Sequence, residues 1–344
     1  MKIDRLVSAG KRFGAAFGAL IALSALAIGH PAQAEVRELR ISRQLGLGYL
    51  QLYVTEDQKL IEKHAKEAGL GDVKVSYLPL GSPATINDAI LSGSADIAGT
   101  GVPPFLLLWD KTYSSQKVKA LTALNAQPAF LNSNKPAIAA LKDFGPNDRI
   151  AVPSVKSSFQ AIILQMAAEK QLGADKRTAL DSLTVSMAHP DGAAALMSAK
   201  TEITGHFTSP PFQYQELQNP AVHKVMSSYE ITGPATFSVL WMTGKFHDAN
   251  PKLSAAVVAA IDEATEFIQK NPEETAKIFL KIEHSDLPAP FIAQLLRDPD
   301  IQYSATPENI TKFSDFMNRI GSTTHKAENW KDLFFNDIQN RSGS

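Results

Sequence analysis

Five short stretches of the sequence combine small residues with hydroxyl, amide or imidazole side chains, and each is expected to join a strand to a helix. They are Gln44–Tyr49, Gly81–Thr85, Gly99–Pro104, Ser154–Phe159 and His189–Asp191. Glycine lets the backbone approach a ligand closely. A helix start presents N–H groups without partners inside the helix and carries a partial positive charge. Several such starts that converge would form a site for an anion or another polar acceptor.

The composition of these turns favours an anion over a cation. No Asp or Glu occurs within Gln44–Tyr49, Gly81–Thr85, Gly99–Pro104, Ser154–Gln160 and Gly205–Phe212. A cationic solute normally requires a carboxylate or an aromatic cage. The side chains that these segments offer instead are Ser82, Thr100, Ser157, Ser158, His206 and Thr208. Hydroxyl, imidazole and backbone N–H groups suit a sulfonate, a sulfate ester, a carboxylate or an inorganic oxyanion.

Two further side chains near the turns each have two interpretations. Arg43 ends the first expected strand and could contact an anion, although an ion pair between elements is the favoured interpretation for such an arginine. His206 is either a core residue beside Phe207 and Phe212 or a group that faces the ligand. Its place in a loop after a strand favours the ligand slightly.

Aromatic residues near the same turns would supply apolar walls for an organic tail of the ligand. Core packing is the favoured interpretation for Phe159 and Phe212, whereas Tyr49 and Trp241 are expected to contact the ligand. The full set of predicted ligand-binding residues is Arg43, Gln44, Gly48, Tyr49, Ser82, Thr100, Gly101, Ser157, Ser158, His206, Thr208 and Trp241.

The elements that position these turns are expected to be short strands that alternate with amphipathic helices. Apolar patterns predict strands at Leu39–Arg43, Val73–Leu80, Asp96–Ala98, Lys119–Leu124 and Arg149–Val152. This order predicts an α/β fold with mostly parallel sheets and helices on both faces. The C-terminal part is expected to be a helical wrap over Pro251–Lys270, Pro272–Lys281, Pro290–Arg297, Pro307–Ile320 and Ala327–Asp337.

The first 34 residues have the pattern of a secretory signal peptide. Basic residues precede an uncharged stretch from Phe13 to Ile28, and the small-x-small triplet Ala32–Ala34 follows. Cleavage is expected after Ala34, with export into a bacterial periplasm. An uncleaved anchor is the disfavoured alternative, because the stretch is short and diluted by Ala and Gly.

Composition excludes several classes of protein. The 344 residues are 44% hydrophobic and 20% charged, which indicates a globular chain, and the absence of cysteine excludes thiolate metal sites and cysteine nucleophiles. The 34 basic and 35 acidic residues form no run that would suit nucleic acid. No nucleophile elbow, zinc helix or phosphate loop occurs, so no catalytic residue, metal or cofactor is predicted.

The segment Glu38–Asp110 resembles the N-terminal portion of the nitrate/sulfonate/taurine-type substrate-binding proteins of ABC importers. The most specific part is the Ala-x-x-x-Gly-x-x-Asp-Ile signature at Ala89–Ile97, followed by the Thr-Gly turn at Thr100–Pro104. Leu141–Gly173 resembles the family's segment that enters the second lobe. A weaker likeness runs over Pro190–Phe212, where this chain lacks a glycine and an aspartate that the family usually has.

The resemblance implies a type II periplasmic binding fold, in which two α/β lobes close over a solute. The first lobe is then expected to contain residues 35–125 and 241–344, and the second residues 126–240. The hinge crossings are expected near Asn125–Phe130 and Gly233–Leu240. The implied protein is a monomeric periplasmic receptor, not an enzyme, whose partners are a small anionic solute and the permease and ATPase subunits of an importer at the inner membrane.

Two alternatives use the same fold. One is an enzyme related to the thiamine-pyrimidine synthases of fungi, which depend on a cofactor bound to lysine, a donor histidine and a cysteine-rich segment. The absence of cysteine and the predicted signal peptide argue against it. The other is a periplasmic sensor or adaptor that passes a solute signal to a receptor, and its sequence would have the same features.

Overall fold

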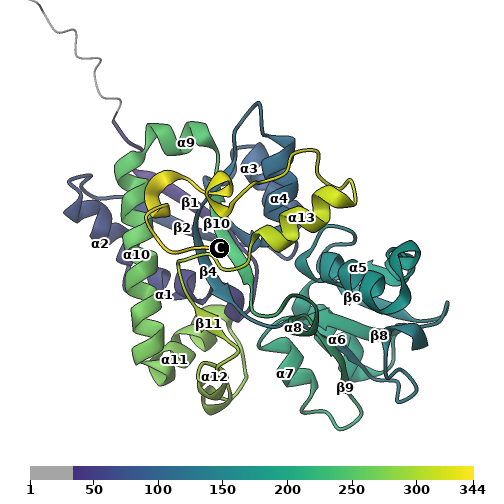
Figure 1. The fold of residues 1–344 in the computed structure, drawn as a ribbon. Coiled ribbons are helices and arrows are strands. Elements are labelled where there is room, and N and C mark those ends of the chain that lie inside the picture. Colours follow the sequence, from purple (N-terminus) through teal and green to yellow (C-terminus); the bar gives the residue numbers. More distant parts are fainter. Residues whose placement is uncertain (1–33) are drawn as a thin grey trace, which may run out of the picture. The chain divides into compact units, whose positions relative to one another are not determined.

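The computed structural model describes residues 34–344, and residues 35–344 form one compact unit built on two β-sheets (Figure 1). Within the described residues, the first sheet has six strands in the order β11-β4-β10-β3-β1-β2. They are β1 (Glu38–Arg43), β2 (Lys74–Pro79), β3 (Ile97–Gly101), β4 (Lys119–Ala126), β10 (Thr236–Met242) and β11 (Gln302–Tyr303). Strand β1 runs parallel to β2 and β3, whereas β10 runs antiparallel to β3 and β4.

The second sheet has five strands in the described chain, in the order β7-β6-β8-β5-β9. They are β5 (Phe130–Ser133), β6 (Arg149–Val152), β7 (Thr184–Ser186), β8 (Ile203–Thr208) and β9 (His223–Ser227). Strand β6 is parallel to β7 and β8, and β5 is antiparallel to β8 and β9. Each sheet with its helices forms one lobe.

The predicted α/β fold class is confirmed, but the sheets are mixed rather than mostly parallel. In each sheet the strands joined through helices are parallel, as expected for βαβ units. Antiparallel pairs arise because β10 and the short β11 in the first sheet, and β5 in the second, run opposite to those parallel strands.

The chain passes from the first sheet to the second between β4 and β5, and it returns between β9 and β10. Strand β10 starts at Thr236 and pairs with the first sheet from that residue onward. The division expected between residues 240 and 241 therefore falls inside a strand of the first sheet.

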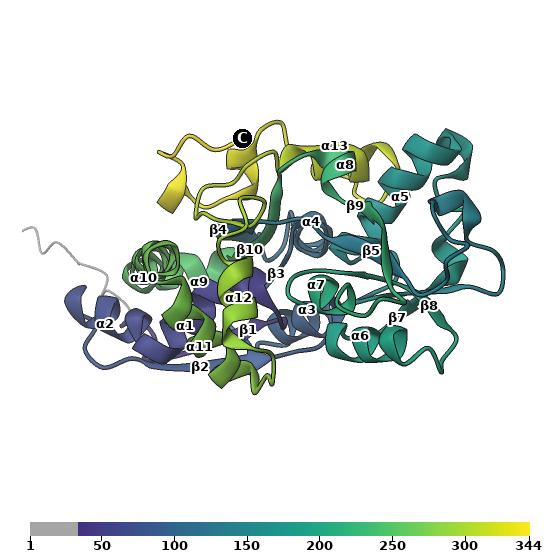
Figure 2. The same cartoon turned by 90° about the horizontal axis from the view of Figure 1, so that it is seen from below.

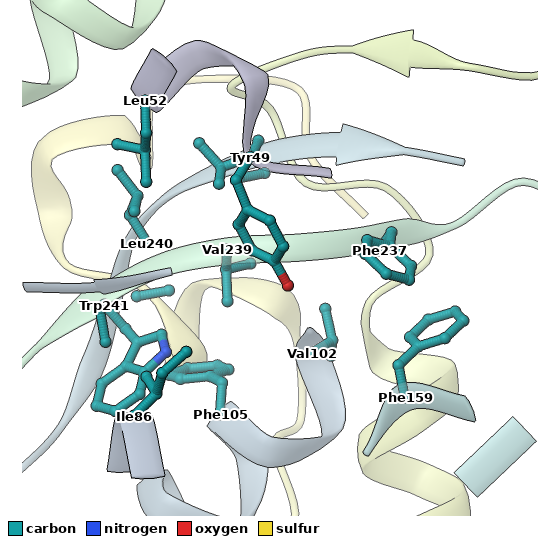
Figure 3. Packing of buried hydrophobic residues seen from close by; sticks show 14 of the residues in the cluster. Tyr49, Leu52, Ile86, Val102, Phe105, Phe159, Phe237, Val239, Leu240 and Trp241 are labelled. Carbon is teal, nitrogen blue, oxygen red and sulfur yellow. The ribbon is translucent and has the colours of Figure 1, made fainter. Parts of the chain in front are cut away.

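Helices cover both faces of the six-stranded sheet. On one side α1 (Leu50–Gln58), α2 (Leu60–Glu67), α10 (Pro251–Lys270) and α11 (Pro272–Glu283) pack on one another (Figure 2). Helices α3 (Pro83–Leu91), α4 (Val102–Lys111) and α13 (Thr311–Arg319) form a second group. Adjacent residues of β10 point to opposite faces, so Leu240 packs beside Leu52 of α1 while Trp241 packs on Phe105 of α4 (Figure 3).

Four helices belong to the five-stranded sheet: α5 (Phe159–Leu172), α6 (His189–Ser198), α7 (Phe212–Glu216) and α8 (Tyr229–Thr232). Helix α6 packs on β8, β6 and α7, whereas α5 packs on α8 and also reaches α4 of the other lobe. The starts of α5 and α6 are the two predicted turns of this lobe.

The C-terminal wrap is helical over part of its predicted length. Helix α10 has the predicted bounds, and α9 (Gly244–Ala249) and α12 (Ala289–Leu295) accompany it. The helix predicted from Pro307 starts only at Thr311, because Glu308 N–H donates to the Thr236 hydroxyl in an extended approach to β10. Residues 327–337 are not an α-helix but two short 3-10 turns. Their backbone instead bridges β4, where Phe335 N–H donates to the Ala120 carbonyl.

The predicted signal peptide lies outside the described residues, except for Ala34 at its end. Among residues 34–344, no helix is both long and apolar enough to span a membrane.

Candidate functional site

The turn after β1 rests on the segment after β8. Gly46 has a φ of 102°, which lies in the left-handed region that favours glycine. A side chain there would begin 3.0 Å from the Pro210 carbonyl oxygen and 3.2 Å from the Phe212 ring. The Leu47 N–H donates to the same Pro210 carbonyl at 3.0 Å. The first predicted turn therefore contacts the other lobe through its backbone.

The remaining turns also meet across the lobes. A Cβ at Gly81 would lie 3.4 Å from the Ala188 Cβ, directly before α6. A Cβ at Gly101 would lie 3.1 Å from the Phe159 Cβ at the start of α5. Figure 3 shows the Phe159 ring beside Phe237 of β10, with ring centroids 4.6 Å apart. The structure thus brings all five predicted turns to the contact between the lobes.

The helix starts offer fewer free N–H groups than the sequence suggests. Ser82 accepts a hydrogen bond from Thr85 N–H at 3.3 Å, and Ser158 accepts one from Ala161 N–H at 3.2 Å. Both serines therefore cap their own helices. Helix α4 carries prolines at its second and third positions, which have no N–H group. Recognition here would depend on side-chain hydroxyls and amides as well as on backbone groups.

Two other predicted hydroxyls are also held by neighbours. The buried Thr100 hydroxyl donates to the Gly101 carbonyl at 3.1 Å. Ser157 lies 2.8 Å from the Ser154 hydroxyl and lines a cavity of about 220 Å³ with residues of α3 and α4. Ser157 is therefore at the outer side of the contact, whereas Thr100 is inside it.

His189 is the centre of a group of hydrogen-bonded polar side chains in the second lobe, and it was not among the predicted ligand-binding residues. Its buried imidazole stands at the first position of α6 and stacks on Phe212, with centroids 5.7 Å apart. Nδ1 lies 2.7 Å from the Thr208 hydroxyl, and Nε2 lies 3.5 Å from both the Gln160 amide nitrogen and the Ser209 hydroxyl. The sequence places His189 before Pro190 in one of the five turns, and this was the available signal.

Burial lowers the pKa of His189 well below its ordinary value, and the nearby His206 acts in the same direction. The ring is therefore neutral near pH 7. A neutral imidazole has one donor and one acceptor nitrogen. When Nε2 accepts the hydrogen bond from the Gln160 amide, Nδ1 carries the proton and donates to the Thr208 hydroxyl oxygen. The Thr208 hydroxyl proton is then available to a ligand acceptor.

His206 lies in the interior of the second lobe, next to His189. Its Nδ1 hydrogen-bonds to the buried Glu216 carboxylate, whose other oxygen accepts from Asn132 at 2.8 Å. Its Nε2 faces Gly192 of α6, where a Cβ would lie only 2.5 Å away. The centroids of the His206 and His189 rings are 5.6 Å apart. His206 therefore supports the packing of α6 on β8, and Thr208 on the same strand makes the contact with His189.

Arg43 forms an ion pair between elements. The buried guanidinium lies 3.3 Å from Glu283 of α11 and 3.5 Å from Glu56 of α1, and it covers the Tyr53 ring at 3.9 Å. The Tyr53 hydroxyl also hydrogen-bonds to Glu283. Burial raises the pKa of Glu283, while Tyr53 and Arg43 lower it. Two carboxylates thus face one guanidinium, so little of the Arg43 charge is left for an anion.

The two favoured aromatic residues lie in different places. The Tyr49 hydroxyl donates to the Gln44 amide oxygen at 3.0 Å, and its ring would contact a Cβ at Gly99 at 3.4 Å. Both residues are buried beside the turns. Trp241 is fully buried among Phe105 and the helices α3 and α4, as Figure 3 shows. The structure therefore does not bring Trp241 close to the other predicted residues, because its side chain lies on the face of β10 that packs against α3 and α4.

A cavity of about 420 Å³ opens between the lobes next to Phe212. One wall comes from α6 and α7, and the other from the end of α11 and the loop after it. The lining residues are Pro190, Ala193, Ala194, Met197, Pro211, Phe212, Gln215, Phe279, Glu283, His284, Ser285, Asp286 and Leu287. Sequence reasoning missed the α11 wall, because no local pattern shows that this helix end reaches the second lobe. The apolar part of the wall suits an organic group.

No group of three His, Cys, Asp or Glu side chains is placed to hold a metal ion among residues 34–344. The polar side chains around His189, where the turns meet, are hydroxyls and carboxamides, and the carboxylates of Glu283 and Asp286 lie at the adjoining cavity. This set can hydrogen-bond to a small polar solute.

Comparisons with known proteins agree with this geometry. A family model described as the NMT1-like family matches residues 32–282. No curated protein matches the chain.

Solved structures share the fold at low sequence identity. The periplasmic nitrate-binding protein NrtA from Synechocystis PCC 6803 has a TM-score of 0.70 and 15% identity, with 90% of each chain covered. The alkanesulfonate-binding protein SsuA from Xanthomonas axonopodis pv. citri, solved with MOPS, has a TM-score of 0.66 and 15% identity, covering 84% of this chain and 95% of that one. A ligand-binding component of an ABC-type import system from Staphylococcus aureus, with zinc bound, has a TM-score of 0.67 and 16% identity, covering 90% and 99%. The predicted fold is confirmed by these structures.

Proposed function

Because the chain belongs to the NMT1-like family and has the fold of ligand-binding proteins of ABC importers, we propose that it is the periplasmic solute receptor of such an importer. In this proposal it binds a small organic anion between its lobes and delivers it to a membrane permease and its ATPase subunits. A carboxylate, sulfonate or sulfate ester is the expected acidic group. The protein binds this solute and does not transform it.

The observation that carries the proposal is the meeting of all five turns across the lobes. Glycines on the first lobe lie against Pro210, Ala188 and Phe159 of the second. Buried polar groups of the second lobe, notably Thr208 and His189, lie beside these contacts and are hydrogen-bonded to each other. Burying such groups is costly unless each finds a partner. A solute that accepts hydrogen bonds from this set would stabilise the closed state over the open one.

The nearby cavity supports an organic rather than an inorganic anion. Met197, Phe212 and Phe279 give it apolar walls, and a volume of about 420 Å³ exceeds the need of a small inorganic ion. Glu283 and Asp286 at its edge would repel a second acidic group. The acid is therefore expected at the Thr208 end and the carbon skeleton towards the cavity.

A thermal-shift titration tests this function. Residues 35–344 are mixed with benzoate, ethanesulfonate, a sulfate ester, nitrate or an alkylamine, and the melting temperature is measured at increasing concentrations. A bound organic acid should raise it with the logarithm of concentration over Kd. Stabilisation by the amine alone contradicts the anion proposal, and chemical turnover of any solute contradicts the receptor proposal.

A matched pair of variants locates the site. Thr208→Val keeps the shape of a buried side chain but removes its hydroxyl, and it should weaken the bound acid about tenfold, the effect of losing one hydrogen bond to a charged group. Ser254→Ala removes a hydroxyl that is also buried but lies in α10 against the Met242 sulfur. It should leave the affinity unchanged.

A further inference from the structure

Gln127 lies where the chain passes from β4 to β5, and its side chain is fully buried. Neither its amide oxygen nor its amide nitrogen has a hydrogen-bond partner in the described part of the chain. Both atoms lack a partner, so turning the amide over does not change this result. A buried donor or acceptor without a partner destabilises a folded protein, because the hydrogen bonds it made to water in the unfolded chain are not replaced. Such a group calls for a specific explanation.

A second carboxamide faces the same place. Asn125 is two residues earlier, and its Nδ2 donates to the Gly48 carbonyl at 2.5 Å and to the Ser238 hydroxyl at 3.0 Å. Its Oδ1 is fully enclosed without a partner among residues 34–344. Gly48 also borders Gln127, because a Cβ at Gly48 would lie 3.1 Å from the Gln127 Nε2. Three unpartnered polar atoms, two acceptors and one donor, are thus grouped around one glycine.

This group lies at the inner end of the lobe contact. The same Cβ at Gly48 would lie 2.9 Å from the Phe237 ring, and that ring packs on Phe159 at the start of α5. Gly48 belongs to the turn that contacts Pro210, and Phe159 contacts the turn of Gly101. The two carboxamides therefore face the region where turns of both lobes meet.

We infer that Gln127 and Asn125 bind the solute directly, and that the solute carries an N–H or O–H donor in addition to its acidic group. The inference rests on the proposed receptor function. A bare oxyanion offers only acceptors, so it would satisfy the Gln127 N–H and leave both amide oxygens unpaired. A hydroxy acid, an amino acid or an amide-bearing acid would satisfy acceptor and donor together. A site built for such a donor discriminates strongly against an analogue without it.

Gly48 is part of this recognition. Its missing side chain leaves the Gln127 amide and the Phe237 ring in contact with its backbone. Its carbonyl accepts from the Asn125 nitrogen, which leaves Oδ1 as the Asn125 side-chain atom without a partner in the described chain. The glycine thus holds the acceptor oxygen in place for the solute.

The test uses pairs of acids that differ by one donor: ethanesulfonate with 2-hydroxyethanesulfonate, and benzoate with 4-hydroxybenzoate and 4-aminobenzoate. Affinities are measured by calorimetry on residues 35–344. In the wild type, the donor-bearing member of at least one pair should bind at least about tenfold more tightly, the effect of one satisfied buried group. In Gln127→Leu this preference should fall below about threefold, and the donor-free member should also bind more weakly, because it loses the hydrogen bond from the Gln127 N–H.

The melting temperature without ligand gives an independent readout. Gln127→Leu removes an unpartnered buried amide, so the variant should melt about 2–4 °C higher than the wild type. Gln213→Leu is the matched control, because Gln213 is equally buried but its amide accepts from Phe130 N–H at 2.9 Å and donates to the Pro128 carbonyl at 3.1 Å. The control should melt lower than the wild type.

The outcomes separate this inference from the function on which it rests. If the acids bind but the members of each pair bind equally, the solute donor is disproved and the receptor function stands. If Gln127→Leu melts lower, as Gln213→Leu does, Gln127 has a structural partner such as a buried water and the inference is wrong. If none of the acids binds, the proposed organic-acid receptor is wrong and this inference falls with it.

Discussion

The two lobes contribute different chemistry to the contact between them. The first lobe brings glycines, aromatic rings and carboxamides, and its closest approaches are made by backbone, as between Leu47 N–H and the Pro210 carbonyl. The second lobe brings hydroxyls and an imidazole that are linked to each other, as in the Thr208–His189 pair. One side therefore fixes the shape of the contact, and the other supplies a preassembled polar network. Variants of the first side should change closure, whereas variants of the second should change stability and polar recognition.

The largest effect is expected where the polar network is anchored. Glu216 is fully buried between the His206 imidazole and the Asn132 amide. Glu216→Ala leaves both partners buried without the carboxylate. Each buried hydrogen-bonding group that loses its partner costs about 1–3 kcal/mol of unfolding free energy. Urea denaturation of the ligand-free protein measures this loss.

The control for Glu216 is an exposed acid of the same lobe. Glu202 is largely exposed, and its oxygen lies 3.9 Å from Arg149, so Glu202→Ala should change the unfolding free energy by less than about 1 kcal/mol. An equally small loss for Glu216→Ala would show that the second lobe has no rigid polar network and would remove the contrast between the lobes.

The next largest effect is expected when the shape of the turn after β1, in the first lobe, is changed. Gly46→Ala adds a methyl group only 3.0 Å from the Pro210 carbonyl, which is tighter than ordinary contact and meets backbone rather than a flexible side chain. The lobes would have to separate locally, so an acid that wild-type protein binds should lose affinity by about tenfold to a hundredfold. Calorimetric titration measures this loss.

Gly69→Ala is the control for the backbone strain that an alanine at positive φ introduces. Gly69 has a φ of +79°, and a Cβ there would meet no atom within 4 Å in the described chain. Gly69→Ala carries the cost of an alanine at positive φ, about 1 kcal/mol in stability, and Gly46→Ala carries about 1–3 kcal/mol because Gly46 also has a ψ of 176°. Only Gly46→Ala should lose affinity. Equal affinity in both would mean that the turn after β1 does not form part of the closed site.

The fold could be predicted from local patterns far better than the site. Strand β6 and helix α10 have the predicted bounds, since the continuous apolar run Ile150–Val152 marks the first and Pro251 marks the start of the second. The segment 327–337 was predicted wrongly as a helix because its bridge to Ala120 joins residues more than 200 positions apart. Local periodicity contains no information on such a pairing.

The same distinction explains which site residues were found. The five turns are local signals, and all five reach the lobe contact. His189 and Gln127 were not among the predicted residues, because their environments depend on distant elements, Thr208 and Gln160 for the imidazole and Gly48 for the amide. Trp241 was favoured as an aromatic near a turn, but alternation along β10 turns it towards α4. The alternation of side chains along a strand can be predicted from the local sequence. Which of the two faces a helix covers depends on distant parts of the chain.

The smallest expected effect is a pH dependence of the unfolding free energy that arises from the second lobe. Burial holds the pKa of His189 well below its value in the unfolded chain, about 6.5. Below pH 6.5 the unfolded chain therefore binds a proton that the folded protein excludes. This difference lowers the unfolding free energy as pH falls, by at most about 1.4 kcal/mol per pH unit for one group.

His189→Asn removes this contribution while keeping a polar side chain at the start of α6. Between pH 6.5 and 5.0, the unfolding free energy of the variant should fall less steeply with decreasing pH than that of the wild type. Ser254→Ala is the control, since it removes a buried hydroxyl but no titratable group. It should keep the wild-type slope. Identical slopes for the wild type and His189→Asn would mean that the imidazole takes up a proton in the folded state, and the second lobe would then present a cation to an anionic solute, in place of a neutral network.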